Sequence, residues 1–249
     1  MEYISCKSAL SKSRLPGLNY TFNPYVGCKH GCIYCYVPDV LKLNMDWGRE
    51  VYIKRNVLNI LRREVLYKKP GIVGISTSTD PYQSIEKDLE ITRRAIMILN
   101  SAGFRISIQT KSPLVLRDLD LMNERFDVGF TITSFNEDFR KKFEPNAPSI
   151  DERISALEEI SSRGIKTWIF YGPVISGFND SEDDIKNIVL LASKTKSKII
   201  YDKLNIKPKV IKRMQGINIK EVNFKKLINL CKEHSVKYEP AFRGEPYEH

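Results

Sequence analysis

The sequence predicts an α/β protein built as a partial (β/α)6 barrel of the TIM type. Short apolar segments alternate with longer amphipathic ones, and this alternation repeats about six times along the 249 residues. Repeated alternation of strands and helices produces a parallel sheet with helices outside it. A complete eight-fold barrel needs about 250 residues, and the loops of this chain leave room for roughly six units. No Gly-, Ser- or Pro-rich linker interrupts the pattern, so we expect one domain over residues 1–249.

Strands are expected where apolar residues alternate with polar ones or form short continuous runs. Phe104, Ile106 and Ile108 alternate with polar residues, whereas 72–75 is nearly continuous. These patterns are typical of half-buried and fully buried strands, respectively. The six expected strands are Tyr20–Val26, Ile72–Ser76, Phe104–Gln109, Val128–Thr133, Thr167–Tyr171 and Ile199–Ile206.

Helices are expected between these strands. The first ends before Gly103, a residue type that often terminates helices. The second opens with Ser149 and Glu152 in the spacing of a capping box. The expected helices span 88–102, 149–163, 180–193 and 223–234.

Composition limits the class of protein. The chain lacks an apolar run of 18 residues and has no signal-peptide pattern at its start, so we expect a cytoplasmic protein without membrane association. Five cysteines in this length do not indicate a disulfide scaffold. The net charge of +10 and pI near 9.3 leave two interpretations open: a solvated lysine-rich surface, or attraction of nucleic acid or an acidic substrate. The stretch 207–213 is one of the basic clusters.

Polar residues follow nearly every expected strand. In barrels of this type the loops at the carboxyl ends of the strands build the active site. The sequence therefore predicts one shared polar pocket. The residues at these positions are 27–36, 76–81, 110–112, 134, 172–173 and 207–209.

Three cysteines follow the first strand as Cys28-x3-Cys32-x2-Cys35. Iron–sulfur clusters are usually held by four thiolates, so three would leave one iron open to another ligand. Two alternatives are zinc bound with His30 and a redox pair at the last two cysteines. Structural zinc sites normally use two ligand pairs, and no second pair follows here. This absence, the position after the first strand and Tyr34 before the last cysteine favour a [4Fe–4S] cluster on all three.

The cysteine loop resembles the signature of the radical S-adenosylmethionine (SAM) superfamily, Cys-x3-Cys-x-aromatic-Cys. With a tyrosine after the last cysteine, it is more similar to the spore photoproduct lyase-like branch. The resemblance covers most of the chain. Further similar segments are STSTDPYQSIEK (76–87), QTKSPLVLRD (109–118), FEPNAPSIDERISAL (143–157) and GPVISGFND (172–180).

The resemblance implies an enzyme that binds the cluster and SAM. It would cleave SAM reductively to a 5′-deoxyadenosyl radical, which abstracts hydrogen from an unidentified substrate. Such an enzyme needs a reductant such as ferredoxin or flavodoxin. The protein's tasks would be to position SAM, tune the cluster and exclude competing reactions.

Five residues are implied as SAM contacts. Tyr34 would lie against the adenine, and Thr79, Lys111 and Ser134 match positions that bind SAM, with Lys111 pairing its carboxylate. A carboxylate and ribose hydroxyls need one cation and several small donors, which agrees with these residue types. Arg153 is a further candidate, for which a solvent-facing helix position is the alternative.

Two residues bear on the reaction. Tyr36 matches a tyrosine that relays hydrogen in the lyases, and a packed aromatic beside the cluster is its alternative. Thr77 stands where the lyases have a hydrogen-donating cysteine, and an alcohol O–H bond is too strong for that role. The resemblance therefore does not extend to photoproduct repair, and both a nucleic acid and a small molecule or peptide stay open as substrates.

A different class of function is a non-catalytic zinc- and nucleic-acid-binding module, which the cysteines and the basic charge would serve. Cys231 and His234 could form half a metal site, but the apolar face around Cys231 favours a buried structural thiol. The C-terminal segment 236–249 is expected to cover the open barrel, where Arg243 could pair with Glu245, and a frayed tail is the alternative.

Overall fold

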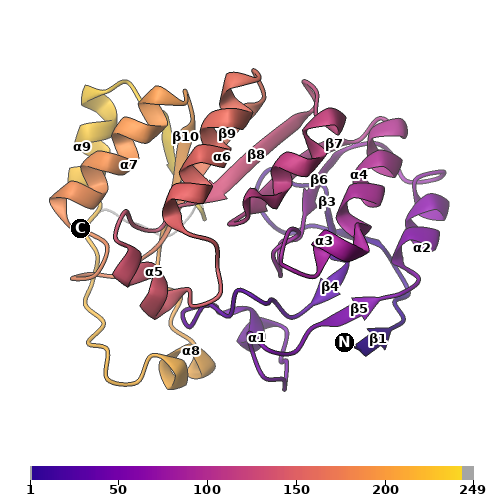
Figure 1. Ribbon diagram of the computed structural model, residues 1–249, viewed down its shortest axis with the longest axis horizontal. Coiled ribbons are helices and arrows are strands. Elements are labelled where there is room, and N and C mark those ends of the chain that lie inside the picture. Colours follow the sequence, from indigo (N-terminus) through magenta and orange to yellow (C-terminus); the bar gives the residue numbers. More distant parts are fainter. Residues whose placement is uncertain (1, 243–249) are drawn as a thin grey trace.

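The computed structural model describes residues 2–242 and contains a large curved sheet with helices on its outer face (Figure 1). The order of its strands is β11-β10-β9-β8-β7-β6-β3-β2. Neighbours from β3 to β11 pair in parallel, whereas β2 is antiparallel to β3. The strands are β2 (Leu10–Lys12), β3 (Tyr20–Phe22), β6 (Ile72–Ile75), β7 (Arg105–Thr110), β8 (Phe126–Thr131), β9 (Lys166–Val174), β10 (Lys198–Lys203) and β11 (Tyr238–Pro240).

This sheet confirms the predicted partial barrel. Within the described residues, the edge strands β2 and β11 do not pair with each other, so the sheet is not closed. All six expected strands are present, as β3 and β6 to β10. A seventh parallel strand, β11, lies in the segment 236–249 and extends the sheet beside β10. Residues 243–249, which include Arg243 and Glu245, lie outside the described part of the chain.

The first expected strand, Tyr20–Val26, is wrong in its extent, because it is divided at Asn23 and Pro24. Proline has no N–H to donate to a strand ladder, which explains the break. Beyond it the chain leaves the large sheet and enters a small one with the order β1-β5-β4. The small sheet consists of β1 (Glu2–Ile4), β4 (Tyr25–Val26) and β5 (Tyr52–Lys54).

The expected helices cover the outer face of the large sheet, as α4 (Ile91–Ser101), α6 (Ile150–Ser162), α7 (Glu182–Lys194) and α9 (Lys225–Glu233). The capping box of α6 is confirmed, since Ser149 and Glu152 each accept from the other's backbone N–H. The expected helix 88–102 is wrong as one element: Glu90, with φ +48°, separates α3 (Glu86–Leu89) from α4. Helices without a prediction are α1 (Val37–Val40), α2 (Val57–Glu64), η1 (Pro113–Leu121), α5 (Glu137–Phe143) and α8 (Pro208–Arg213).

The main hydrophobic core lies between the sheet and the outer helices. Ile106, Val128 and Ile169 point from the strands into this layer and are fully buried, together with Leu157 of α6. Burial of one such side chain stabilises the fold by about 1.5–3 kcal/mol. Among the described helices, none is long and apolar enough for a bilayer span.

The inner face of the sheet is not filled in the same way. On β9, Trp168 and Phe170 are only partly buried, while the alternate residues Ile169 and Tyr171 are buried against the helices. The inner residues line a cavity of about 1080 Å³ that extends from the cysteine loop into the barrel. Complete barrels fill this space with branched apolar side chains, whereas this chain leaves a chamber lined by both apolar and polar side chains.

Candidate active site

The cysteine loop, residues 27–36, connects β4 to α1 and depends on two glycines. Gly27 has φ +94°, and a Cβ there would lie 2.5 Å from the carbonyl oxygen of Glu50. Gly31 has φ +62° and lies against Gly48, whose Cα would be 3.1 Å from an added Cβ. A side chain at Gly27 would collide with backbone and one at Gly31 would crowd it, so the path of the loop favours glycine at both positions.

Long-range hydrogen bonds fix the loop in place. Ile33 N donates to the Phe143 carbonyl at 3.0 Å, and Lys29 N donates to Gln83 Oε1 at 2.9 Å. Helix α8 holds the far side, where Arg213 Nε donates to the Ile33 carbonyl at 3.0 Å and Nη2 donates to the carbonyl of the last cysteine. Part of the basic stretch 207–213 therefore secures the cysteine loop and is not a solvated face.

Cys28, Cys32 and Cys35 all line the cavity. Burial raises the pKa of all three thiols, that of Cys32 to about 12 against the opposing charge of Lys111. Thiols with high pKa values stay protonated until a metal displaces the proton, and iron binding would have to do so here.

The arrangement of these groups is compatible with a cluster. Within residues 2–242, no three Cys, His, Asp or Glu side chains converge closely enough to hold one metal ion. Each cysteine ligand of a cubane binds a different iron, so its ligands need not converge. His30, the fourth ligand of the zinc alternative, has Nε2 3.1 Å from Asp80 Oδ2. The donor set therefore fits a [4Fe–4S] cluster, and the contact with Asp80 would leave Nδ1 of His30 as its only nitrogen for a zinc ion.

Asp80 connects the loop after β6 to the end of β7. Its carboxylate accepts from Thr110 Oγ1 and from Lys111 N, each at 2.8 Å. Burial alone would raise the pKa of Asp80, but His30 and these hydrogen bonds hold it at about 2. The strand ends therefore meet around a fixed negative charge.

Thr79 lies on the cavity wall beside the cysteine loop. Its hydroxyl donates to the Gly27 carbonyl at 2.5 Å and accepts from Gln83 Nε2 at 2.9 Å. A hydroxyl has one proton and two lone pairs, so Thr79 can still accept one more hydrogen bond.

Glu144 joins three of the predicted site residues, although the sequence reasoning gave it no role. Its Oε1 accepts from the hydroxyl of Tyr34 and lies 4.0 Å from Lys111 Nζ. Its Oε2 lies 2.6 Å from Arg153 Nη1, and both of these side chains are fully buried. The signal for it was indirect: two cations expected in one buried site need an acid to balance them.

The charges of this group are fixed by mutual contact. Burial would raise the pKa of Glu144, but Arg153 and Lys111 lower it to about 2. Burial would lower the pKa of Lys111, but Cys32 and Glu144 raise it above its ordinary value. Lys111 is therefore a cation whose side chain also lies 5.7 Å from the centre of the Tyr34 ring.

The structure does not bring all predicted residues to the cavity. Tyr34, Thr79 and Lys111 line it; Ser134 and Arg153 do not. Ser134 is buried and donates to Asp184 Oδ1 at 2.8 Å. The solvent-facing alternative for Arg153 is wrong, because the side chain is 0% exposed, and its direct contact with SAM stays a prediction.

The guanidinium of Arg153 is occupied by protein groups. It donates from Nε and Nη2 to the Pro148 carbonyl at 3.0 and 2.8 Å, and from Nη1 to the Thr131 carbonyl at 3.2 Å. With Glu144 as its fourth contact, Arg153 connects the start of α6 to the end of β8.

Tyr36 and Thr77 both line the cavity. Burial raises the pKa of Tyr36, and the neighbouring Cys35 adds to this. Tyr36 therefore keeps its phenolic O–H at neutral pH, and its role in hydrogen transfer stays a prediction. Cys231 is fully buried in the main core, as expected for a structural thiol.

Comparison with known proteins agrees with this geometry. Residues 22–192 match the family model of the radical SAM superfamily. The chain is 34% identical over 183 residues to an uncharacterized protein of Methanocaldococcus jannaschii, covering 72% of this chain and 69% of the relative. It is 29% identical over 204 residues to an uncharacterized protein of Mycobacterium tuberculosis, covering 75% of this chain and 59% of that protein. A radical SAM Nalpha-GlyT isomerase of Pseudomonas phage M6 is 25% identical over 177 residues, 66% of this chain and 35% of the isomerase.

Solved structures share the fold at low sequence identity. Spore photoproduct lyase complexed with dinucleoside spore photoproduct superimposes with a TM-score of 0.73 at 15% identity, over 96% of this chain and 81% of the lyase. A radical SAM methyltransferase from Sphaerobacter thermophilus gives 0.63 at 17% identity, over 94% and 69%. The open parallel barrel, the cysteine loop at its mouth and the match over most of the chain lead to one conclusion: this chain belongs to the radical SAM superfamily.

Proposed function

We propose that the chain holds a [4Fe–4S] cluster on Cys28, Cys32 and Cys35, and that it cleaves SAM reductively to abstract hydrogen from a substrate. One observation carries the proposal: the three cysteines open into the same cavity as Lys111 and Tyr34. The bound cluster would supply the electron that breaks a C–S bond of SAM and releases a 5′-deoxyadenosyl radical. The remaining tasks fall to the chain's own residues.

Lys111 is the proposed partner of the SAM carboxylate. Its side chain is 14% exposed and its Nζ lies 4.0 Å from Glu144, so Glu144 holds the ammonium without closing a tight ion pair. An incoming carboxylate can then form a shorter, charge-assisted hydrogen bond. We propose that Tyr34 contacts the adenine and that Thr79 accepts from a ribose hydroxyl through its free lone pair.

Ser134 and Arg153 remain proposed contributors to SAM binding, through the residues that they hold. Arg153 positions Glu144 and hence Lys111. Ser134 shares Asp184 Oδ1 with the backbone N–H of Phe135, which orders the loop after β8.

Tyr36 is the proposed hydrogen relay between the cavity and the substrate radical. It follows Cys35 directly and lines the cavity, and a phenolic O–H can donate a hydrogen atom. Thr77 lines the same cavity, but its alcohol O–H bond is too strong to donate a hydrogen atom. The named relatives act on different compounds, so the substrate, whether a nucleic acid or a small molecule or peptide, is not carried over from them.

An external reductant such as ferredoxin or flavodoxin is part of the proposal, as is a reducing, cytoplasmic setting that keeps the thiolates available. The entry of electrons is proposed beside α8, because Arg213 places a cation next to the carbonyl of Cys35. An acidic carrier would meet the further lysines of the stretch 207–213 there.

The test is anaerobic reconstitution with iron and sulfide, followed by addition of dithionite and SAM. We expect a cluster absorption band and formation of 5′-deoxyadenosine. Cys32→Ala should abolish both, whereas Cys6→Ala should abolish neither, because Cys6 lies by Asn56 outside the loop. A cluster without SAM cleavage would contradict the proposal. One tightly bound zinc with no iron would support the non-catalytic zinc- and nucleic-acid-binding module instead.

A further inference from the structure

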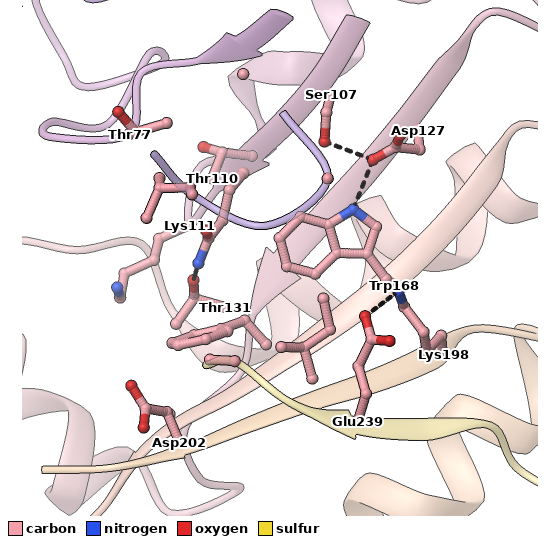
Figure 2. Close-up of a pocket in the computed structure, with 18 of the residues that line it drawn as sticks. Thr77, Ser107, Thr110, Lys111, Asp127, Thr131, Trp168, Lys198, Asp202 and Glu239 are labelled. Carbon is pink, nitrogen blue, oxygen red and sulfur yellow. Dashed lines mark hydrogen bonds and ion pairs between the residues drawn. The ribbon is translucent and has the colours of Figure 1, made fainter. Parts of the chain in front are cut away.

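The part of the cavity inside the barrel contains an aromatic side chain at a defined level. Trp168 of β9 is in register with Gly129 of β8, two residues before the pair Thr131 and Phe170. At about 3.3 Å per residue, Trp168 therefore lies roughly 7 Å deeper in the barrel than Lys111, which follows the end of β7. Figure 2 shows the indole near the centre of the residues drawn, beside Asp127.

The indole has one side fixed against the sheet. A Cβ on Gly129 would lie 2.2 Å from Cε2 of Trp168, so the ring covers the glycine backbone directly. Trp168 nevertheless lines the cavity and is only partly buried. The glycine therefore lets the ring lie flat against β8 with its remaining surface toward the cavity.

Asp127 orients the ring and keeps a spare acceptor. Trp168 Nε1 donates to Asp127 Oδ1 at 2.9 Å, and Ser107 Oγ donates to the same oxygen at 2.7 Å (Figure 2). Within residues 2–242, no group hydrogen-bonds to Oδ2 and no cation pairs with this carboxylate, although Lys166 is level with it on β9. Because Asp127 is half-buried and lines the cavity, Oδ2 is open to a hydrogen-bond donor on a ligand.

The surrounding wall completes a slot with one apolar and one polar side. Phe170 and Ile200 line the cavity near the indole, whereas Gln109 and Thr131 line it on β7 and β8. Gln109 Nε2 donates to Thr131 Oγ1 at 3.2 Å, and within the described residues Gln109 Oε1 has no donor. Aromatic faces beside a few placed acceptors are the usual surroundings of a planar ring with N–H groups.

We propose that this slot binds a planar heteroaromatic ring of the substrate, stacked on Trp168, with a ring N–H or amino group donated to Asp127 Oδ2. The inference rests on the proposed function, since it places the ring below the SAM-binding end of the same cavity. The competing explanation is that Asp127 only holds Trp168 in a structural position.

Binding is tested by calorimetry on the reconstituted enzyme in the presence of SAM. The probes are uridine and guanosine, each with its N-methylated counterpart, 3-methyluridine and 1-methylguanosine. A fifth probe, 5,6-dihydrouridine, keeps the N–H but loses the planar ring. We expect at least one parent nucleoside to bind, and both loss of its N–H and loss of planarity to weaken binding roughly tenfold or more.

The variants separate the two explanations. Trp168→Ala should weaken binding of the parent nucleoside roughly tenfold or more, and Trp168→Phe should recover part of it. Asp127→Asn keeps an acceptor for Trp168 and Ser107 but replaces Oδ2 with an amide donor, so the preference over the N-methylated ring should disappear. Gly129→Ala should displace the indole, which remains present, and should therefore weaken binding of the ring. Lys87→Gln, at an exposed position of α3 that does not line the cavity, is the control and should leave binding unchanged.

Two sources of the ring are distinguished by a single-stranded oligonucleotide of uridine or guanosine. Tighter, salt-sensitive binding of the oligonucleotide assigns the ring to a nucleic acid, and preference for the free nucleoside assigns it to a small molecule. The proposal is overturned if neither nucleoside binds, or if SAM displaces the ring one for one. It is also overturned if Trp168 and Asp127 variants with an unchanged unfolding temperature bind the ring as tightly as the wild type.

Failure of the ring site and failure of the proposed function give different results. An enzyme that forms 5′-deoxyadenosine but binds no ring overturns only the ring site. A chain that binds the ring but assembles no cluster overturns only the radical chemistry.

Discussion

Two buried glutamates in this molecule have the same kinds of partner, but their pKa values are shifted in opposite directions. Glu144, at the mouth of the barrel, accepts from the hydroxyl of Tyr34 and pairs with an arginine. Glu86, at the start of α3, accepts from the hydroxyl of Tyr25 and pairs with Arg117 at 3.0 Å. Burial raises the pKa of Glu86, whereas that of Glu144 is lowered to about 2.

The difference lies in how completely each counter-charge is committed. Arg153 is fully buried against Glu144, and Lys111 adds a second cation. Arg117 is 20% exposed and also contacts Asp118 at 2.7 Å, so Glu86 receives only part of its charge. The mouth of the barrel thus keeps a fixed anion, Glu144, that positions a cation. At the start of α3, by contrast, the carboxyl of Glu86 is protonated more readily than an ordinary glutamate.

The largest expected effect is that of removing the fixed anion. Glu144→Gln leaves Arg153 buried without a counter-charge and should lower the free energy of unfolding by about 3–5 kcal/mol. Glu86→Gln should lower it by about 1 kcal/mol, because Arg117 keeps Asp118 and the amide keeps an acceptor. Urea denaturation of both variants measures this difference, and equal losses would break the comparison.

Acid should separate the two carboxyls next. The pKa of Glu144 is about 2 in the folded state, below its ordinary value of 4.5. Its contribution, on the order of 3 kcal/mol, is therefore present above pH 4.5 and lost as the pH falls toward 2. The pKa of Glu86 is raised in the folded state, so its protonation on acidification favours folding and does not add to the acid loss of stability.

The measurement is the free energy of unfolding between pH 5 and 2, the window that runs from the ordinary pKa of a glutamate, 4.5, down to the folded-state value of about 2 for Glu144. Glu144→Gln should flatten the acid loss of stability, and Glu86→Gln should not. A Glu86→Gln profile as flat as that of Glu144→Gln would show that the two sites do not differ.

Removal of the tyrosine hydroxyls at the two sites should have a smaller effect. Tyr34→Phe and Tyr25→Phe each remove one hydroxyl that donates to a buried carboxylate. Each should cost about 1.5–3 kcal/mol, with Tyr34→Phe at the lower end because Thr133 Oγ1 donates to the same oxygen at 2.9 Å. Thermal unfolding of the pair ranks them, and a larger loss for Tyr34→Phe would reverse this order.

The smallest effect on stability should come from Lys111→Met. Glu144 keeps Arg153 as its closer partner at 2.6 Å, so loss of the ammonium at 4.0 Å should lower the free energy of unfolding by about 1 kcal/mol, and the methionine retains the packing of the stem. Affinity for SAM, measured by equilibrium dialysis, should nevertheless fall roughly tenfold or more because the carboxylate loses its cation. An unchanged affinity would leave Glu144 and Lys111 as a purely structural pair.

Local patterns predicted much of the site. The cysteine spacing, the polar strand ends and the capping box at Ser149 each depend on residues close in sequence, and Tyr34 and Lys111 follow from a motif and a strand end. The division of the expected helix 88–102 was missed, since helical spacing continues through Glu90 although its backbone is left-handed.

What could not be predicted depends on distant contacts. Glu144 is 110 positions from Tyr34, and only the folded barrel makes them partners. Trp168 and Gly129 are explained by the register between β8 and β9, which a strand pattern alone does not determine. An isolated glycine in a strand signals close approach of another group, but not which group approaches.

The open barrel has a consequence for the behaviour of the protein in concentrated solution. A sheet that is not closed exposes two edges to which another molecule's strand could add. Both edge strands are only three residues long, and Pro240 of β11 has no N–H to offer. Beside β2, the Glu64 carboxylate accepts from the backbone N–H groups of Ala9 and Leu10 at 3.2 and 2.6 Å. Within residues 2–242, both edges of the open sheet are therefore poor templates for a strand of another molecule.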